Sequence, residues 1–400
     1  MDDTITPFTL AIPQAQLDDL KDRLARTRWP ERETVDDWQQ GVPLAAARAL
    51  VDHWQHRYDW RRCEAALNAV GQFTTAIDGL NVHFLHRPSP NSGALPLILT
   101  HGWPGSVVEF LKVVGPLADP AAHGGDPRDA FHVVCPSLPG YGFSDRPAEK
   151  GWGVPRIAAA WITLMKRLGY ARFGAQGGDW GAAVTTALGA SGDPAVAGIH
   201  LNMVTVRPSE EDMADATDAE KAALADLKRH ADQGTGYSKQ QSTRPQTLGY
   251  GLVDSPVGQA MWIYEKFHEW TDCNGVPENA LTRDEMLDDI MIYWLTGTGA
   301  SSARLYWESF GAFGGQKVTV PTGCRPGAAS SPRKSCDRRA AGRKKATPTS
   351  STGTSWIAAG ISPPSNNRTC SWKRYAPPSA RCADTTPARR WRSPRHPPPG

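Results

Sequence analysis

The sequence has few cysteines, no long apolar run and, in its last part, almost none of the large aliphatic side chains that build a core. Its seven cysteines show neither a paired framework nor a C-x-x-C spacing, which argues against a disulfide-rich secreted domain. No apolar stretch reaches the length of about 18 residues needed to cross a membrane. The start, Met1-Asp2-Asp3, also lacks the basic region and apolar run of a signal peptide. We therefore expect a cytoplasmic protein without a membrane partner.

The composition of the chain changes near Cys324. Residues 1–324 carry 28 basic and 39 acidic side chains, whereas residues 325–400 carry 12 Arg and 4 Lys against 2 Asp. The second part contains no Leu, Val or Phe and only two Ile. It cannot bury enough apolar area to offset the loss of chain entropy, so residues 324–400 are expected to form a disordered basic tail. Its charge would favour weak, salt-sensitive phosphate binding, but nucleic acid is not the expected partner.

Residues 1–72 have the apolar periodicity of helices and are expected to precede any strand. Leu17, Leu20 and Leu24 form one apolar stripe, which stops before Trp29-Pro30. Similar spacing recurs up to residue 70, so a helical N-terminal segment is predicted.

From residue 73 to residue 206, short apolar runs alternate with glycine-rich turns and helical patterns. The first two runs flank Asp78-Gly79, a dipeptide that favours a two-residue hairpin turn. The later runs are continuously apolar, as in strands covered on both faces, and lie at 97–100, 131–135, 171–175 and 197–201. This alternation predicts an α/β fold with a doubly wound, mostly parallel sheet.

Residues 207–312 interrupt this rhythm with charged helical patterns, several tryptophans and no clear strand. A short apolar run at 317–320, within residues 313–323, then returns to the strand pattern. We expect a helical cap inserted into the sheet, followed by one more core strand.

The sequence Gly177-Gly178-Asp179-Trp180-Gly181 lies between an apolar strand and a helical run. It fits the G-x-nucleophile-x-G elbow of α/β-hydrolases, with aspartate where serine usually stands. Glycines are needed because the sharp turn strains the central residue and brings strand and helix backbones close together. A carboxylate placed there can attack carbon and form an alkyl ester that water later opens. Taken alone, the motif also fits an ordinary glycine-rich turn.

A second motif, His101-Gly102-Trp103-Pro104-Gly105, follows the strand that ends at Thr100. An α/β-hydrolase places its oxyanion loop at this point. The backbone N–H groups of Trp103 and Trp180 could then stabilise the oxyanion that forms when water attacks the ester. A purely structural turn is the alternative. The loop Leu138–Asp145 follows the next strand and is expected to border the same pocket.

These motifs, with the helical N-terminal segment and Leu-Pro-Gly-Tyr-Gly-Phe-Ser at 138–144, resemble the microsomal-type epoxide hydrolases from about Phe8 to about Gly323. The resemblance implies an α/β-hydrolase that opens small hydrophobic epoxides to vicinal diols through an Asp179 ester, without cofactor or metal. It also implies that Tyr237 and Tyr306 of the cap protonate the epoxide oxygen. A phenol of pKa ~10 stays protonated at neutral pH and can donate to an alkoxide. Without the resemblance, each tyrosine would be taken for core packing.

The general base expected for this fold is missing. After Asp179 the histidines are His200, His230, His268 and His396, none of which lies in a loop beyond a last strand, and no acidic partner is recognisable.

A shift of reading frame accounts for this gap. Read out of frame, residues 358–372 can encode a segment that resembles the family's histidine segment. The histidine codon would straddle Gly360 and Ile361, and a glutamate codon would straddle Arg333 and Lys334, 27 positions earlier. We interpret the sequence after about Cys324 as a frameshifted family C-terminus, and we expect turnover by this chain to be impaired.

Other functions remain open at this point. A haloalkane dehalogenase shares the aspartate nucleophile but needs halide-binding donors instead of acidic tyrosines. A catalytically dead or binding-only product is the non-enzymatic alternative. The histidine pairs His53/His56 and His83/His86 have no Cys, Asp or Glu cluster to complete a metal site, so no metal is proposed.

Overall fold

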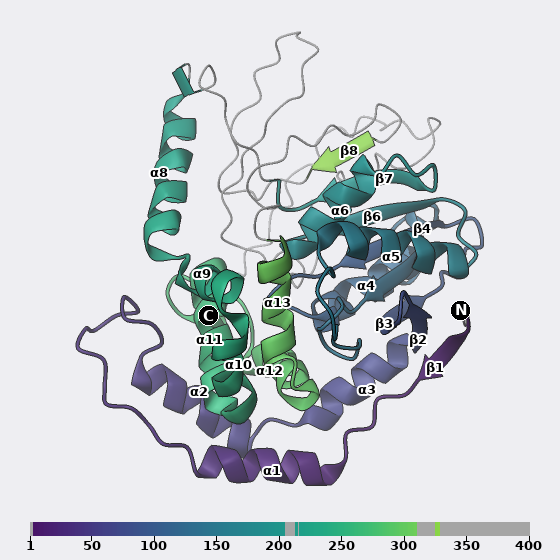
Figure 1. The fold of residues 1–400 in the computed structure, drawn as a ribbon. Coiled ribbons are helices and arrows are strands. Elements are labelled where there is room, and N and C mark those ends of the chain that lie inside the picture. Colours follow the sequence, from purple (N-terminus) through teal and green to yellow (C-terminus); the bar gives the residue numbers. More distant parts are fainter. Residues whose placement is uncertain (1–2, 205–212, 215, 310–324, 329–400) are drawn as a thin grey trace, which may run out of the picture.

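An eight-stranded, mostly parallel sheet forms the centre of the computed structural model, which describes residues 3–204, 213–214, 216–309 and 325–328 (Figure 1). The strands are β1 (Ile5–Phe8), β2 (Gln72–Ile77), β3 (Leu80–Arg87), β4 (Leu95–Thr100), β5 (Phe131–Pro136), β6 (Phe173–Gly177), β7 (Val196–Leu201) and β8 (Arg325–Ala328). Their order is β1-β2-β3-β5-β4-β6-β7-β8, with antiparallel pairing as far as β5 and parallel pairing beyond it. The predicted α/β-hydrolase class is thereby confirmed.

The apolar runs of the sequence form the buried centre of this sheet. Leu97, Ile98 and Leu99 of β4 are all buried. Because successive side chains of a strand point to opposite faces, both faces of β4 are covered. The Asp78-Gly79 hairpin is also confirmed, with positive φ angles of 52° and 85° between β2 and β3. Asp-Gly tolerates this left-handed geometry.

The order of the strands predicts where a site can form. β4 lies between β5 and β6, so the chain leaves β4 toward one side and later returns on the other. In open α/β sheets, ligands bind at such a switch point, at the carboxyl ends of the strands. Thr100 pairs with Gly177, so the loops that follow β4 and β6 leave the same edge side by side.

Helices surround the sheet. They are α1 (Gln14–Ala25), α2 (Leu44–His56), α3 (Trp60–Val70), α4 (Leu111–Ala118), α5 (Val154–Arg167), α6 (Trp180–Ala190), α8 (Asp218–Gln233), α9 (Gly236–Thr243), α10 (Pro245–Asp254), α11 (Pro256–Trp270), α12 (Arg283–Thr296) and α13 (Gly299–Ser309). In Figure 1 the N-terminal helices α1 and α2 lie beside the later helices α11 and α12. The stripe of Leu17, Leu20 and Leu24 is buried, as expected. Every long element described between residues 213 and 309 is helical, in line with the predicted cap.

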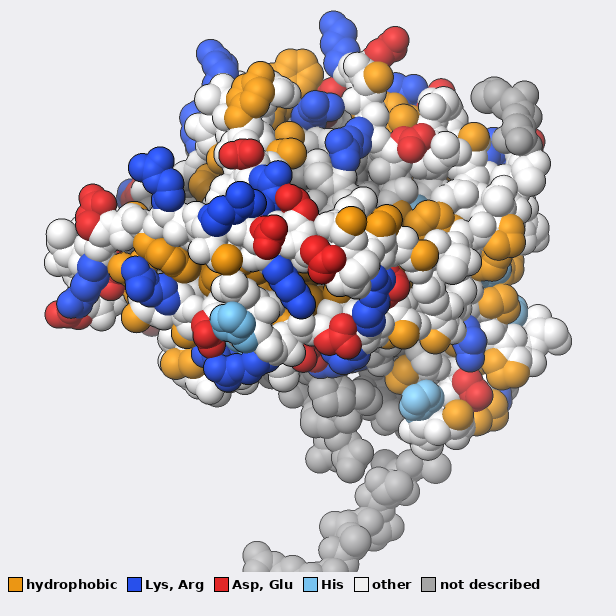
Figure 2. Space-filling view, turned by 90° about the horizontal axis from the view of Figure 1, so that it is seen from below, with side chains coloured by type: hydrophobic (Ala, Val, Ile, Leu, Met, Phe, Trp, Pro, Cys, Tyr) orange, Lys and Arg blue, Asp and Glu red, His pale blue; other side chains and the backbone are white. Residues whose placement is uncertain are grey.

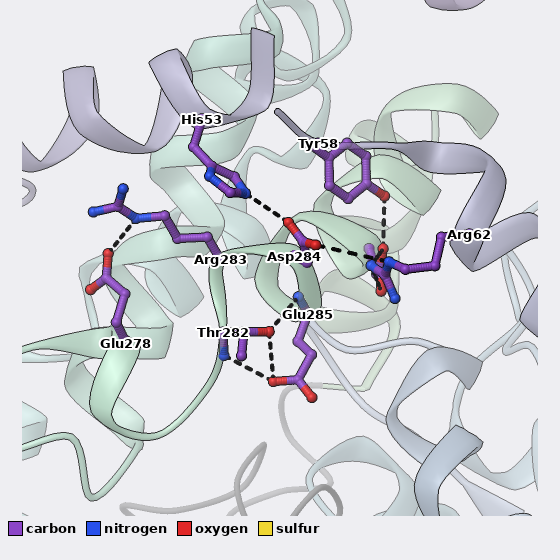
Figure 3. Close-up of polar contacts among 9 residues, drawn as sticks. His53, Tyr58, Arg62, Glu278, Thr282, Arg283, Asp284 and Glu285 are labelled. Carbon is purple, nitrogen blue, oxygen red and sulfur yellow. Dashed lines mark hydrogen bonds and ion pairs between the residues drawn. The ribbon is translucent and has the colours of Figure 1, made fainter. Parts of the chain in front are cut away.

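Figure 3 shows how the N-terminal helices are tied to α12. His53 Nε2 lies 2.7 Å from Asp284 Oδ1. Arg62 donates to both carboxylate oxygens of Asp288 at 2.8 and 2.7 Å, and the Tyr58 hydroxyl donates to the same side chain at 2.8 Å. Burial raises the pKa of Asp288, and the bonds from Arg62 and Tyr58 lower it. These contacts fix the position of α12 relative to the rest of the molecule.

Two expectations about strands were wrong. β1 precedes the helices and pairs with β2, although a strand was not expected before residue 73. Arg325–Ala328, expected to belong to a disordered tail, pairs in parallel with β7 as β8. Pairing uses backbone N–H and C=O groups, so the lack of large side chains does not prevent it. The strand expected at 317–320 and the tail beyond residue 328 lie outside the described residues.

One face of the molecule has mixed charge. On the face shown in Figure 2, Lys and Arg side chains are interspersed with Asp and Glu. This face therefore offers no continuous basic surface of the kind that binds nucleic acid. Within the described ranges, no helix is long and apolar enough to cross a membrane.

Candidate active site

Asp179 occupies the strained position of the turn between β6 and α6. Its φ is 50° and its ψ is −129°, a conformation that a non-glycine residue adopts only when its surroundings impose it. A Cβ on Gly177 would lie 2.1 Å from the Gly181 carbonyl oxygen, and one on Gly181 would lie 1.9 Å from that of Thr100. The flanking glycines therefore permit the close approach of β4, β6 and α6 that holds Asp179 in place.

Two backbone donors hold the Asp179 carboxylate. The Trp103 N–H donates to Oδ1 at 2.8 Å, and the Trp180 N–H also hydrogen-bonds to this side chain. Burial raises the pKa of Asp179 to about 6, and the two backbone hydrogen bonds lower it. The carboxylate is therefore mostly ionised at neutral pH. Asp179 is only partly exposed to solvent. An ionised carboxylate with little solvation is a competent nucleophile.

The loop after β4 is shaped to reach this carboxylate. A Cβ on Gly102 would lie 2.2 Å from Asp179 Oδ1, so only glycine fits there. In the same loop, the peptide bond between Trp103 and Pro104 is cis. His101 is not a base: its Nδ1 lies 2.9 Å from the Gly102 carbonyl oxygen, and its Nε2 accepts the Leu138 N–H at 3.2 Å. Burial lowers the pKa of His101 to about 4, so a neutral imidazole braces one loop against the other.

The structure brings Tyr237 of α9 and Tyr306 of α13 to the same place. Their ring centroids are 5.8 Å apart at 81°. Tyr237 stacks on Trp103 at 5.1 Å, and Tyr306 meets Trp180 edge to face at 4.8 Å. Burial raises the pKa of both phenols, and the negative charge of Asp179 raises both further. Both phenols are therefore protonated at neutral pH and lie within the electrostatic reach of the carboxylate.

Further residues hold the loop that follows β4, and the sequence did not reveal them. Asp289 and Tyr293 lie one turn apart on α12. Asp289 Oδ1 accepts a hydrogen bond from Ser106 Oγ at 2.6 Å, and the Tyr293 hydroxyl donates one to the Gly105 carbonyl oxygen at 2.8 Å. Burial raises the pKa of Asp289 to about 8. The pKa of Glu109 is raised well above its usual range by burial and by the charges of Asp289 and Asp179. Only the i, i+4 spacing on α12 could have suggested this contact.

No described histidine lies in a loop beyond the last strand of the sheet, where this fold places its base. Of those that follow it in the chain, His200 lies in β7, His230 in α8 and His268 in α11, where its ring stacks on Trp38 at 3.8 Å. The segment in which a base was expected lies outside the described residues. Among the described side chains, no three His, Cys, Asp or Glu groups are gathered as for a metal ion.

Comparison with known proteins decides the family. Residues 5–110 match the family model "Epoxide hydrolase N terminus", and residues 96–250 match "alpha/beta hydrolase fold". The chain is 58% identical over 320 residues to a Stigmatella aurantiaca protein provisionally named an epoxide hydrolase, with 80% of this chain and 73% of that one covered. It is 34% identical over 357 residues to epoxide hydrolase 1 of Oryctolagus cuniculus, with 80% and 78% covered. The chain belongs to the epoxide hydrolase family.

Solved structures of epoxide hydrolases share its fold. The juvenile hormone epoxide hydrolase of Bombyx mori superposes with a TM-score of 0.73 at 29% identity, covering 82% of this chain and 83% of that one. The epoxide hydrolase of Aspergillus niger gives a TM-score of 0.71 at 33% identity, with the same coverage of 82% and 83%.

Proposed function

We propose that this epoxide hydrolase opens its substrate by direct attack of Asp179 on an epoxide carbon. A carboxylate oxygen forms the new C–O bond, the ring C–O bond breaks, and its electron pair moves to the epoxide oxygen. That oxygen takes a proton from Tyr237 or Tyr306, which leaves a β-hydroxyalkyl ester on Asp179. The observation that carries this proposal is one ionised carboxylate on a strained turn, bound by two N–H groups and facing two protonated phenols.

The second step returns the carboxylate. Water adds to the ester carbonyl, and the N–H groups of Trp103 and Trp180 are placed to stabilise the resulting oxyanion because they already bind the carboxylate. Collapse of this intermediate releases the vicinal diol, with one water oxygen retained on Asp179. A general base is needed to take the proton of the attacking water, and no described residue fills that role.

The lining of the site favours a small hydrophobic epoxide. Trp103, Trp180 and Trp270 surround the two tyrosines, with Trp270 edge to face against Tyr237 at 5.1 Å. We further propose that residues 207–312 form the cap over Asp179, residues 1–72 form its support, and the protein acts in the cytoplasm, converting reactive epoxides to diols. A cell fractionation that places it in membranes would contradict the location.

Peptide mass mapping after brief exposure to an aryl epoxide tests the reaction. We expect the mass of one epoxide on the peptide that contains Asp179, and none in Asp179→Asn. As a matched control, Asp52→Asn removes an exposed carboxylate and should label normally. Label on another carboxylate would refute the assignment of the nucleophile. Alkylation by a haloalkane with release of halide, but not by the epoxide, would favour the dehalogenase alternative.

A further inference from the structure

Lys266 of α11 is a buried cation beside the proposed proton donors. Its side chain is only 4% exposed. Its Nζ lies 4.8 Å from the centroid of the Tyr237 ring and 5.4 Å from that of Trp270. It also donates to Glu265 and, at 2.8 Å, to Glu269. An ammonium group is strongly hydrated and is rarely buried, so its position against two aromatic faces calls for an explanation.

The two phenols of the site differ in their surroundings. Tyr237 contacts the Lys266 cation, whereas the rings closest to Tyr306 are those of Trp180, Tyr237 and Trp103. Burial is the largest cause of the raised pKa of both phenols. A hydrogen bond with the Tyr306 side chain lowers the pKa of Tyr237, whereas the charge of Tyr237 raises the pKa of Tyr306. The neighbouring hydroxyl of Tyr306 therefore favours the anionic form of Tyr237. The cation over the ring favours the same form, because opposite charges attract.

We propose that Lys266 is a positioning residue that makes Tyr237 the stronger of the two acids. This inference rests on the proposed function. When the phenol gives its proton to the epoxide oxygen, it becomes a phenolate, and the ammonium group attracts the phenolate more strongly than the phenol. The stabilisation therefore grows toward the transition state and accelerates the step.

Other charges near Tyr237 oppose this effect, and the pKa of its phenol stays above its usual value in the unmodified chain. Asp179 and Glu269 both raise the pKa of Tyr237. However, the side chains of Glu265 and Glu269 are 38% and 31% exposed, so water screens their charge, while the Lys266 ammonium is enclosed. Asp179 loses its charge as it forms the ester, which removes its opposition at the stage when the phenolate appears.

The test measures single-turnover alkylation of Asp179 by an aryl epoxide in three backgrounds. Lys266→Met keeps the length and apolar stem of the side chain but removes its charge. In Tyr306→Phe, where Tyr237 is the only donor, it should slow alkylation about tenfold, the change expected if the ammonium group stabilises the phenolate over the phenol by about 1.4 kcal/mol. In Tyr237→Phe it should change the rate less than about twofold, and in the unmodified chain the slowing should be intermediate. Lys266→Arg should restore most of the rate.

If Lys266→Met slows alkylation equally in Tyr237→Phe and Tyr306→Phe, then Lys266 only supports α11 and the proposal is wrong. If Lys266→Met causes no slowing in Tyr306→Phe, the proposal is also wrong. A second readout does not require the reaction. With 3,5-difluorotyrosine at position 237, whose phenol ionises at lower pH than that of tyrosine, absorbance titration reports its pKa directly, and Lys266→Met should raise that pKa by about one unit. If no variant is alkylated but this shift is found, the proposed function fails and the role of Lys266 stands. If the shift is absent, the role of Lys266 fails.

Discussion

At the scale of single residues, the proposed first chemical step depends on the ionisation of Asp179. Its pKa is raised to about 6 by burial, so the carboxyl group is protonated and unreactive below this value. The two phenols have pKa values raised above their usual range and stay protonated through neutral pH. The nucleophile and the acids are therefore both in their active forms above about pH 6.

We predict from this that the rate of alkylation rises with pH, with a midpoint near pH 6, and then stays level to about pH 9. Rapid mixing with an aryl epoxide, followed by mass analysis of the acid-quenched protein, measures the rate at each pH. Tyr306→Phe serves as a control, because it should lower the plateau but leave the midpoint unchanged. A midpoint near pH 4 would show that Asp179 is not desolvated in the way described.

The two phenols should substitute for one another in part. Either Tyr237→Phe or Tyr306→Phe leaves one donor near the epoxide oxygen. We expect a loss of about tenfold from Tyr237→Phe, which removes the stronger acid, and a smaller loss from Tyr306→Phe. The double variant has no donor, and its alkylation should be at least ~10³-fold slower, as for loss of a general acid. Tyr250→Phe is a suitable control since that side chain is 71% exposed. Alkylation at the normal rate in the double variant would rule out both tyrosines as acids.

At the scale of helices and strands, α12 connects the N-terminal helices to the active-site loop. Arg62 and Tyr58 bind Asp288 on one part of this helix, while Asp289 and Tyr293 bind Ser106 and Gly105. The support of the loop thus depends on residues far from Asp179.

We predict that Arg62→Ala lowers the free energy of unfolding by about 2 kcal/mol, because it removes the cation that pairs with the largely buried carboxylate of Asp288. Arg57→Ala breaks an ion pair with Asp52 in which both side chains are more than half exposed, so it should cost less than about 1 kcal/mol. Urea unfolding of both variants gives the comparison. Equal losses would show that the contact with Asp288 does not stabilise the fold.

Local patterns predicted most elements, and contacts between distant elements account for the rest. The hairpin at Asp78-Gly79, the apolar strand β4 and the turn at Asp179 each depend on neighbouring residues, so their patterns were sufficient. β1 was missed because it has only four residues, includes Pro7 and acquires its partner from β2.

The same distinction applies to the site. The turn around Asp179 and the loop from His101 carry their own sequence signals. Tyr237 and Tyr306 were chosen by resemblance, since nothing local shows that α9 and α13 bring them to within 5.8 Å between ring centroids. Lys266 gave no signal, and Asp289 gave none beyond its i, i+4 spacing with Tyr293, because a lysine or aspartate in a helix usually faces water.

At the scale of the whole molecule, we predict one round of chemistry and then arrest. The proposed alkylation uses Asp179 and the tyrosines, whereas opening the ester needs a base, for which we propose no described residue. Loss of a triad member costs about 10³- to 10⁶-fold, so the chain should accumulate a stable ester. Intact mass measured over hours after mixing would follow it.

A chain with the reading frame restored near codon 324 is the matched comparison. It should form diol over many turnovers of an aryl epoxide, while the present chain forms less than one equivalent. Multiple turnover by the present chain would contradict the missing-base interpretation.

The bonds between the N-terminal helices and α12 also set an order of events during synthesis. His53 and Asp284 are 231 positions apart, and Arg62 and Asp288 are 226 apart. From the completion of α3 at Val70 until Asp284 is made, α2 and α3 exist without these partners. The faces of α2 and α3 that pack on α12 stay uncovered until that helix has been translated, so these two helices reach their final contacts late in synthesis.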